Sequence, residues 1–414
     1  MNYINKLKIF NDPIYGFVQI PNSIVYDLIE HPYFQRLRNI KQTGFTSIVY
    51  PGANHTRFHH ALGCLHLMQK AIETLKQKKI EITEEEEKAV YIAILLHDIG
   101  HGPFSHALES TIVENIHHET ISLKLMEQLN KEFNGELALA IKIFNKQYHK
   151  IFLSQLIASQ LDIDRLDYLK RDSFYSGVSE GNVNSDRIIT MMNVANDNLV
   201  IEAKGIYSVE KLLTSRMFMY WQVYLHKTSV SAEIYLVQVL KRAKELVKKG
   251  VKVEASEPLL YFLTKSDKKF ETKELQIFAE LDDYDMMMAL KNWQKHEDKT
   301  LSILSRCLIQ RKLPVCSISK EKQSDVILEN HKKNIQQTLQ IEDASYFVHQ
   351  KKLELEIYNT QESPIYLKYK DGMVVNLSDS EHQAMTPFLE KSIKKYHVCY
   401  LNETKLKEIK QTYK

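Results

Sequence analysis

The chain contains few of the residues that break helices or staple small domains. Among its 414 residues are only 12 glycines, 9 prolines and 4 cysteines. The scarcity of glycine and proline argues against a turn-rich β fold and favours long helices. The cysteines are widely spread and form no CxxC pair, which argues against a disulfide framework or a zinc ribbon. We therefore expect reduced thiols and a cytoplasmic protein.

The sequence also lacks a long apolar run and a strong excess of one charge. No run reaches the roughly 18 residues that a transmembrane helix needs, and the N-terminus has no signal-peptide pattern. The 55 basic and 52 acidic residues give a net charge of +3, too small to indicate nucleic acid or a membrane as the main partner. We expect a soluble protein without a membrane partner; binding of nucleic acid is possible but is not predicted.

Apolar periodicity and capping signals predict a mainly α-helical fold with a smaller C-terminal α/β appendage. Thr83 and Glu86 form a capping box that starts one helix, and His97 stands at its far end. Other helices are expected near 56–76, 117–131, 134–146, 150–171, 207–249, 256–265, 272–280, 283–292 and 298–311. Residues 345–377 should form a small mixed α/β or hairpin lobe. We divide the chain into a helical body, residues 1–250, and a C-terminal region of helices and small mixed α/β structure, residues 251–414.

The most informative motif is His97-Asp98, which follows the apolar stretch Ala89–Leu96. That stretch should be a buried helix, and a carboxylate at its end needs a partner because burying an unpaired charge is costly. Histidine nitrogen and aspartate oxygen are ligands that suit a borderline divalent metal ion. The motif therefore predicts a metal site.

A cluster of histidines surrounds this motif in the sequence. Nine of the 17 histidines, His60 among them, lie within 64 consecutive residues, a density that packing alone does not explain. The remaining metal ligand should be a carboxylate farther along the chain, and Asp164 is the candidate. Its neighbours Arg165 and Asp167 could instead form a solvated charged face, which is the usual meaning of such a run.

Three segments together resemble the H…HD…D signature of the HD-domain phosphohydrolases. They are Arg57–His60, His97–His106 and Asp164. The similarity is greatest to the deoxynucleoside triphosphate triphosphohydrolases, which include bacterial dGTPases and the animal SAM-and-HD-domain enzyme, and it extends from Asn11 to about Lys227. The resemblance implies a helical HD-domain catalytic core in residues 1–250. It also implies one divalent metal ion, held by His60, His97, Asp98 and Asp164.

The activity implied by the resemblance is metal-dependent hydrolysis of dNTPs to a deoxynucleoside and inorganic triphosphate. The ligand set leaves the metal open, because manganese, iron, magnesium, zinc, cobalt and nickel all tolerate such ligands. An additional magnesium ion could accompany the triphosphate. Catalytic roles are implied for His101, His106, Glu109 and His118, with the Glu109–His118 pair orienting His106. The family usually has aspartate where this chain has Glu109.

The resemblance also implies a set of substrate contacts. Three arginines fall at positions that bind the triphosphate, and their planar guanidinium groups suit phosphate oxygens. Tyr168 should pack under the deoxyribose and exclude a 2′-hydroxyl. Leu225 and Thr43 differ from their counterparts in the animal enzyme, as does Tyr220, so the base preference does not carry over. The implied substrate-binding residues are Gln42, Arg57, Arg165, Tyr168, Asp172, Arg216, Tyr220 and Tyr224.

A regulatory site and an assembly are implied by the resemblance alone. Relatives bind an activating guanine nucleotide at a subunit interface, at the positions of Asn11, Glu30, Gln35 and Arg38. The segment Gln35–Arg38 could equally be an interior salt-bridge helix. An activating nucleotide and a homo-oligomer are therefore expectations about partners, beside the dNTP substrate.

Three alternatives remain open at the level of sequence. The spacing of His97 and His101 also matches HExxH zinc peptidases, but Gly100 and Gly102 should break the helix that motif requires. Another HD-domain nucleotidase, acting on a different nucleotide, is the first rival to a dNTP triphosphohydrolase. A non-catalytic nucleotide sensor or nucleic-acid-binding scaffold is the second.

Overall fold

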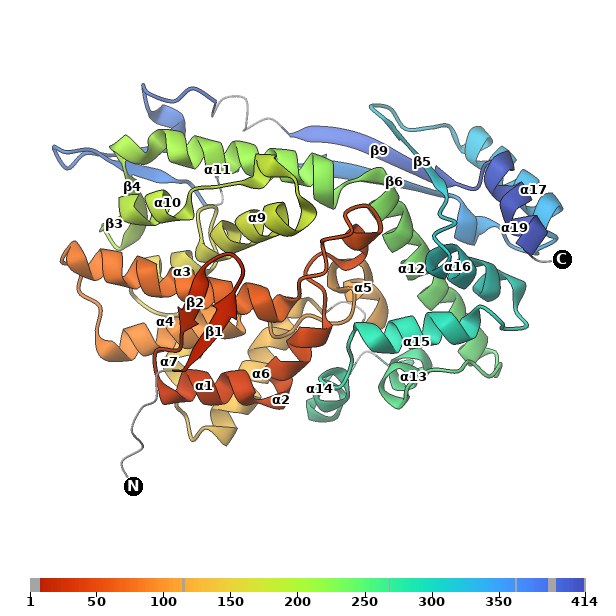
Figure 1. The fold of residues 1–414 in the computed structure, drawn as a ribbon, viewed down its shortest axis with the longest axis horizontal. Coiled ribbons are helices and arrows are strands. Elements are labelled where there is room, and N and C mark those ends of the chain that lie inside the picture. Colours follow the sequence, from red (N-terminus) through yellow and green to blue (C-terminus); the bar gives the residue numbers. More distant parts are fainter. Residues whose placement is uncertain (1–7, 114–115, 268, 362, 386–391, 413–414) are drawn as a thin grey trace.

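The computed structural model describes residues 8–113, 116–267, 269–361, 363–385 and 392–412, without the side chains of Ser105, His106, Ser110 and Thr412. Helices form the body of the molecule, and small sheets lie along its edges (Figure 1). One continuous apolar core runs through the helices of both halves of the chain. The expectation of a mainly helical fold with smaller α/β parts is confirmed.

The first segment is a hairpin of β1 (Ile9–Asp12) and β2 (Gly16–Gln19), with its turn where the sequence predicts one. The Asp12 carboxylate accepts the backbone N–H groups of Ile14 at 2.9 Å and Tyr15 at 3.0 Å, which fixes the turn. Two short helices follow, α1 (Ser23–Glu30) and α2 (Pro32–Gln35). They lead the chain back toward the central helices.

Three helices form the centre of the body, and α3 packs against the other two. They are α3 (Arg57–Gln77), α4 (Glu84–Leu96) and α9 (Ile163–Ser176). The predicted capping box at the start of α4 is present, because Thr83 Oγ1 accepts the Glu86 N–H at 3.2 Å. The chain leaves α4 after Leu96, and α5 (Ser105–Ile112) begins only after the glycine-containing segment. This break confirms that the motif is not the continuous helix of a zinc peptidase.

Two predicted long helices are wrong, because capping side chains divide them. The helix expected over 150–171 is α8 (Ile151–Ile157) followed by α9, since the Asp162 carboxylate accepts the Arg165 N–H at 2.7 Å and caps α9. The helix expected over 207–249 is α11 (Ile206–Met219), a π-helical turn (Tyr220–Tyr224) and α12 (Lys227–Lys248). A π turn widens the helix, a feature that often marks a functional site.

The other helices follow the sequence more closely. Those of the body are α6 (His118–Glu132) and α7 (Ala138–Phe144), whereas α10 (Ser185–Met191) is not predicted from the sequence. Beyond residue 250, four helices match the predicted positions: α13 (Glu257–Thr264), α14 (Thr272–Phe278), α15 (Asp283–Trp293) and α16 (Lys299–Ile309). Two more, α17 (Asp325–Leu339) and α19 (Glu403–Thr412), are not predicted from the sequence.

The hairpin expected within 345–377 is present, but the strands of this segment belong to two different sheets. β6 (His349–Leu355) joins a three-stranded sheet with β5 (Val315–Ser319) and β9 (Ile393–Tyr400), which runs past α11 toward α17 and α19 (Figure 1). The hairpin of β7 (Tyr366–Lys368) and β8 (Val374–Asn376) extends a hairpin of the body, β3 (Met192–Ala195) and β4 (Asn198–Glu202). The β4–β7 pairing joins residues that lie more than 150 positions apart, which local sequence patterns do not encode.

Contacts between helices and between strands cross the proposed division at residue 250. Helix α12 packs against α16, and β4 pairs in parallel with β7, Ile201 opposite Leu367. The division into two domains stays a prediction. Among the described residues, no helix combines the length and apolar character that crossing a membrane requires.

Asp283, the first residue of α15, ties the C-terminal helices to the segment that follows the His97-Asp98 motif. Its buried carboxylate accepts the Lys41 N–H at 2.9 Å and the Phe104 N–H at 2.9 Å. Phe104 has a φ of +47°, a left-handed backbone conformation that is unfavourable for a bulky residue. The hydrogen bond from its N–H holds this conformation in place.

We expect Asp283→Ala to lower the free energy of unfolding by about 2–4 kcal/mol, because two buried N–H groups would lose their acceptor. Urea denaturation followed by circular dichroism measures the difference. Asp325→Ala is the matched control, since that carboxylate is exposed at the first residue of α17. Equal stability of the two variants would contradict the structural role of Asp283.

Candidate functional site

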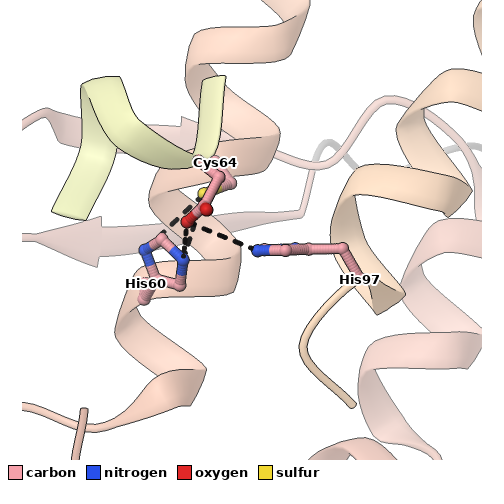
Figure 2. A group of neighbouring side chains, drawn as sticks. His60, Cys64 and His97 are labelled. Atoms are coloured by element: carbon pink, nitrogen blue, oxygen red, sulfur yellow. Dashed lines mark hydrogen bonds and ion pairs between the residues drawn. The ribbon is translucent and has the colours of Figure 1, made fainter. Parts of the chain in front are cut away.

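His60, His97 and Asp164 meet where three helices come together. His60 lies in α3, His97 directly after α4 and Asp164 in the first turn of α9. Asp164 Oδ1 is 3.0 Å from His60 Nε2 and 3.6 Å from His97 Nε2. Figure 2 shows the two imidazole rings directed toward the same point, with Cys64 beside them. The ligand atoms of these four residues all lie within 4.8 Å of one another.

The other nitrogen of each histidine is already bound. His60 Nδ1 is 2.7 Å from the Asp167 carboxylate, and His97 Nδ1 is 2.7 Å from the backbone oxygen of Ile94. Acceptors at both Nδ1 atoms hold one proton on each ring, so the Nε2 atoms that face Asp164 are the nitrogens available to a metal ion. Two imidazole nitrogens and a carboxylate directed at one point form a position that a cation, either a proton or a metal ion, would fill.

The Nε2 atom of His97 gives the sharpest test of whether a metal fits. This nitrogen is buried and has no hydrogen-bond partner among the described residues. Leaving such an atom without a partner is unfavourable, and a divalent metal ion would satisfy it. The donor set of imidazole nitrogens and carboxylate oxygens therefore fits a divalent metal ion.

Asp167 anchors His60 from behind. Arg171 donates to both oxygens of this buried carboxylate, from Nε at 2.9 Å and from Nη2 at 3.0 Å, and also to Asp12 at 2.8 Å. Burial alone would raise the pKa of Asp167, but the Arg171 charge and His60 lower it to about 2. The alternative prediction that this segment forms a solvated charged face is wrong for Asp167, because its side chain is fully buried. Sequence reasoning missed its role because the i, i+4 pair with Arg171 also suits an exposed helix.

Asp98 lies at the edge of the cluster. Its oxygens are 3.5 Å from His97 Nε2 and 3.8 Å from His60 Nε2, and Arg57 donates to it at 2.5 Å. Burial would raise the pKa of Asp98, but its contacts with His97, His101 and the Arg57 guanidinium hold it well below the usual range. The group is an anion, as metal coordination requires.

Cys64 is a neighbour of the cluster that the sequence analysis did not single out. Its sulfur is 3.6 Å from both ring nitrogens of His60, one helical turn away on α3. Burial raises the pKa of this thiol, so it is protonated at neutral pH. Because the thiolate is the form that binds metals, Cys64 is a packing neighbour of the cluster.

Three of the four residues expected to be catalytic form a second group beside Asp98. His101 Nε2 is 3.2 Å from Asp98 Oδ1, and the His101 ring stacks on His118 with centroids 3.8 Å apart. His118 Nδ1 is 2.6 Å from Glu109 Oε1. Burial, together with the charge of Arg57, lowers the pKa of His101 well below its usual value, which favours the neutral ring. The side chain of His106 lies outside the described residues.

A cavity of about 480 Å³ opens from this cluster, and all eight expected substrate-binding residues line it. Its wall also includes Asp98 and Asp164, so the cavity reaches the candidate metal ligands. A second, larger cavity of about 950 Å³ reaches the same carboxylates and the guanidinium groups of Arg165 and Arg216. The candidate metal centre therefore lies where two cavities meet.

Tyrosines and a carboxylate form one part of the smaller cavity. Asp172 is buried; its carboxylate accepts the Tyr224 hydroxyl at 2.6 Å and lies 2.7 Å from His55 Nε2. Tyr168, one turn after Asp164, packs edge-on against Tyr224 with centroids 6.3 Å apart. Sequence reasoning missed His55, whose position in the loop before α3 carries no local signal.

Arginine side chains line the part of the smaller cavity that is nearer the candidate metal ligands. Arg57 is 1 % exposed, and its Nε and Nη2 groups have no hydrogen-bond partner among the described residues. Arg165 pairs with Asp162 at 2.5 Å, and Arg216 donates to the Ile357 carbonyl at 3.0 Å. Donors that lack a partner in a buried site are suited to an anionic ligand.

The residues of the expected regulatory site lie at the N-terminal edge of the body. Asn11 is exposed in β1, and Glu30 is exposed at the end of α1. Gln35 accepts from Arg38 Nε at 2.8 Å, and the Arg38 guanidinium lies 3.6 Å from the centre of the Phe58 ring. The activating nucleotide stays a prediction, because nothing in this arrangement tests it.

Comparison with known proteins identifies the family. The HD domain matches residues 57–172, and the HD-associated region matches residues 183–258. The uncharacterized protein YwfO of Bacillus subtilis is 35% identical over 318 residues, which cover 75% of this chain and 72% of that protein. The chain belongs to the HD-domain phosphohydrolase family. The resemblance seen in the sequence is confirmed.

Two further proteins are similar to this HD-domain protein. A phosphohydrolase from Bacteroides thetaiotaomicron, known from its crystal structure, has 49% sequence identity to this chain. The two structures superpose with a TM-score of 0.92 over 96% of this chain and 100% of the Bacteroides chain. A homolog of the deoxynucleoside triphosphate triphosphohydrolase SAMHD1 from Dictyostelium discoideum is 35% identical over 260 residues. That alignment covers 58% of this chain and 50% of the Dictyostelium protein.

We expect Asp167→Asn to weaken divalent-metal binding by about 10–100-fold, because the amide would hold the His60 ring less firmly in its orientation. Titration of metal-free protein with manganese, followed by calorimetry, measures the dissociation constant. Asp186→Asn is the control, since that carboxylate is exposed and pairs with Lys70. Unchanged metal affinity in folded Asp167→Asn protein would contradict the positioning role.

Proposed function

We propose that the protein hydrolyses dNTPs to a deoxynucleoside and inorganic triphosphate. One observation carries this proposal: a single cavity joins the candidate metal ligands and the unpaired donors of Arg57 to a group of tyrosines around Asp172. One part of the cavity suits phosphates and the other suits a sugar. The similarity to proteins named deoxynucleoside triphosphate triphosphohydrolases supports the same substrate class.

His60, His97, Asp98 and Asp164 are the residues that would hold one divalent metal ion. Such an ion, when bound, neutralises charge on a phosphate and lowers the pKa of water from about 15.7 toward roughly 7. Asp167 and the Ile94 carbonyl keep the two imidazole rings in the orientation that binding requires. The choice among manganese, iron, magnesium, zinc, cobalt and nickel stays open.

Arginines would position the triphosphate. A nucleoside triphosphate carries about four negative charges, and a guanidinium group pairs with two phosphate oxygens at once. Arg57 already holds Asp98 with one Nη group and keeps its other donors for the substrate. Arg165 and Arg216 line both cavities, so the triphosphate product would leave through the larger one.

Bond cleavage needs a proton at the leaving group. Attack of water on the α-phosphorus breaks the bond to the 5′-oxygen, which departs as an alcohol after it gains a proton. We assign that proton to His106, as the family resemblance implies. The stacked pair of His101 and His118, held by Glu109, would orient and tune it.

The sugar would bind beside Tyr168. The Asp172 carboxylate, already held by Tyr224 and His55, can accept a 3′-hydroxyl, and Gln42 lines the same cavity. Tyr168 would pack under the deoxyribose and fill the space of a 2′-hydroxyl. This arrangement favours dNTPs over NTPs.

The deciding experiment is product analysis. Metal-reconstituted protein is incubated with each dNTP and each NTP, and the products are resolved by anion-exchange chromatography. We expect equal amounts of deoxynucleoside and triphosphate, with NTPs left intact. Monophosphate or diphosphate products would move the attack away from the α-phosphorus and support a different nucleotidase. Absence of turnover with every metal, with and without added dGTP as an activator, would support a binding role.

We expect Tyr168→Ala to reduce the preference for dATP over ATP, expressed as a ratio of kcat/KM values, by about 10–100-fold. Removing the ring opens space for a 2′-hydroxyl while the phosphate contacts remain. Tyr207→Ala serves as the control because that ring is 66 % exposed on α11. A ratio that does not change would show that another residue discriminates between the sugars.

A further inference from the structure

One carboxylate in the smaller cavity is used neither by the metal cluster nor by the sugar. Glu233 lies in the second turn of α12, is half-buried and lines the cavity. Among the described residues it makes no hydrogen bond and no ion pair. A half-buried carboxylate without a partner in the protein can accept hydrogen bonds from a ligand that enters the cavity.

The residues around Glu233 leave open space that a planar ring could occupy. A Cβ atom on Gly44 would lie 3.9 Å from the Phe104 ring and 4.0 Å from Glu233 Oε1, so the absence of a side chain keeps this region open. Phe104 stacks on Phe45 with ring centroids 4.6 Å apart and forms an apolar wall of the cavity. Nearby in the same wall, Thr43 Oγ1 is buried without a hydrogen-bond partner among the described residues.

The charge of Glu233 is set by two opposing effects. Burial raises the pKa of this carboxyl to about 7, and the positive charge of Lys351 opposes the shift. At pH 8 most molecules therefore carry the carboxylate, which accepts hydrogen bonds and donates none. A ligand edge with two adjacent donors is its best partner.

We propose, on the basis of the proposed function, that Glu233 recognises the substrate base and selects guanine. Guanine presents two adjacent N–H donors, N1–H and the 2-amino group, which pair with the two oxygens of one carboxylate. Adenine and cytosine place a ring-nitrogen acceptor beside their amino group, and thymine places carbonyl oxygens on both sides of its single N–H. Each of those edges would bring an acceptor against the carboxylate, a repulsion that guanine avoids.

The other groups in this region fit the same base. The buried Phe104 ring offers an apolar contact at the cavity wall, and such a contact does not distinguish one base from another. The Thr43 hydroxyl can donate to a guanine acceptor, which a leucine at this position could not do. Selectivity among bases thus depends on Glu233, while Phe104 contributes affinity.

The test compares kcat/KM for the four dNTPs at pH 8 in the wild-type protein and in Glu233→Gln. The wild type should prefer dGTP. The amide keeps the shape of the side chain but removes the charge and offers a donor to guanine N1–H, so kcat/KM for dGTP should fall by about 10–100-fold. Turnover of dATP should change little. Glu245→Gln is the matched control, because it makes the same change on α12 outside the cavity.

A separate binding measurement keeps the two proposals distinguishable. Deoxyguanosine and deoxyadenosine, which lack phosphates, are titrated into metal-free wild-type and Glu233→Gln proteins. Tighter binding of deoxyguanosine that the variant loses would support base recognition even if no dNTP were hydrolysed. Turnover of all four dNTPs at equal rates, equal binding of the two nucleosides, or an unchanged preference in Glu233→Gln would overturn the role of Glu233 and leave the proposed hydrolysis standing.

Discussion

The buried pairing of Asp167 with His60 and Arg171 is the interaction on which the site depends. It places a carboxylate between α3 and α9, and both neighbours supply the charge or hydrogen bonds that such burial requires. Gly63 permits this close approach, since a Cβ atom there would lie 2.0 Å from Asp167 Oδ1. Arg171 extends the network to Asp12 in the N-terminal hairpin turn. The same contacts thus hold three segments together and orient a candidate metal ligand.

The polar groups around this pairing differ in the kind of ligand atom that each could bind. At the metal cluster the free atoms are lone pairs, with His97 Nε2 the clearest example. In the adjoining cavity, Arg57 carries donors without a partner among the described residues, and Glu233 lines the same cavity. A cation would suit His97 Nε2, a phosphate would suit Arg57, and a base with N–H donors would suit Glu233. The presence of these groups in one cavity is the basis on which we propose a nucleotide as the substrate of this HD-domain protein.

Breaks in the helices make that cavity possible. The Asp162 cap starts α9 at the position that presents Asp164 and Tyr168 to the cavity, and the π turn before α12 contributes Tyr220 and Tyr224. Unbroken helices over these segments would carry different residues on their inner faces, because side-chain direction repeats every 3.6 residues. The sequence pattern of apolar residues continues through both breaks and therefore conceals them.

The sequence by itself determined the helical class, most helix positions and the His97-Asp98 motif, because periodicity, caps and glycine breaks are local properties. It also placed His60 and Asp164 together through resemblance to the HD signature. Only the tertiary structure decided that Asp167 is buried, that His55 supports Asp172, and that Glu233 lines the same cavity as Arg57. It likewise decided that β7 pairs with β4. Such relations depend on which distant segments pack together, and that packing is a property of the whole chain that no local pattern contains.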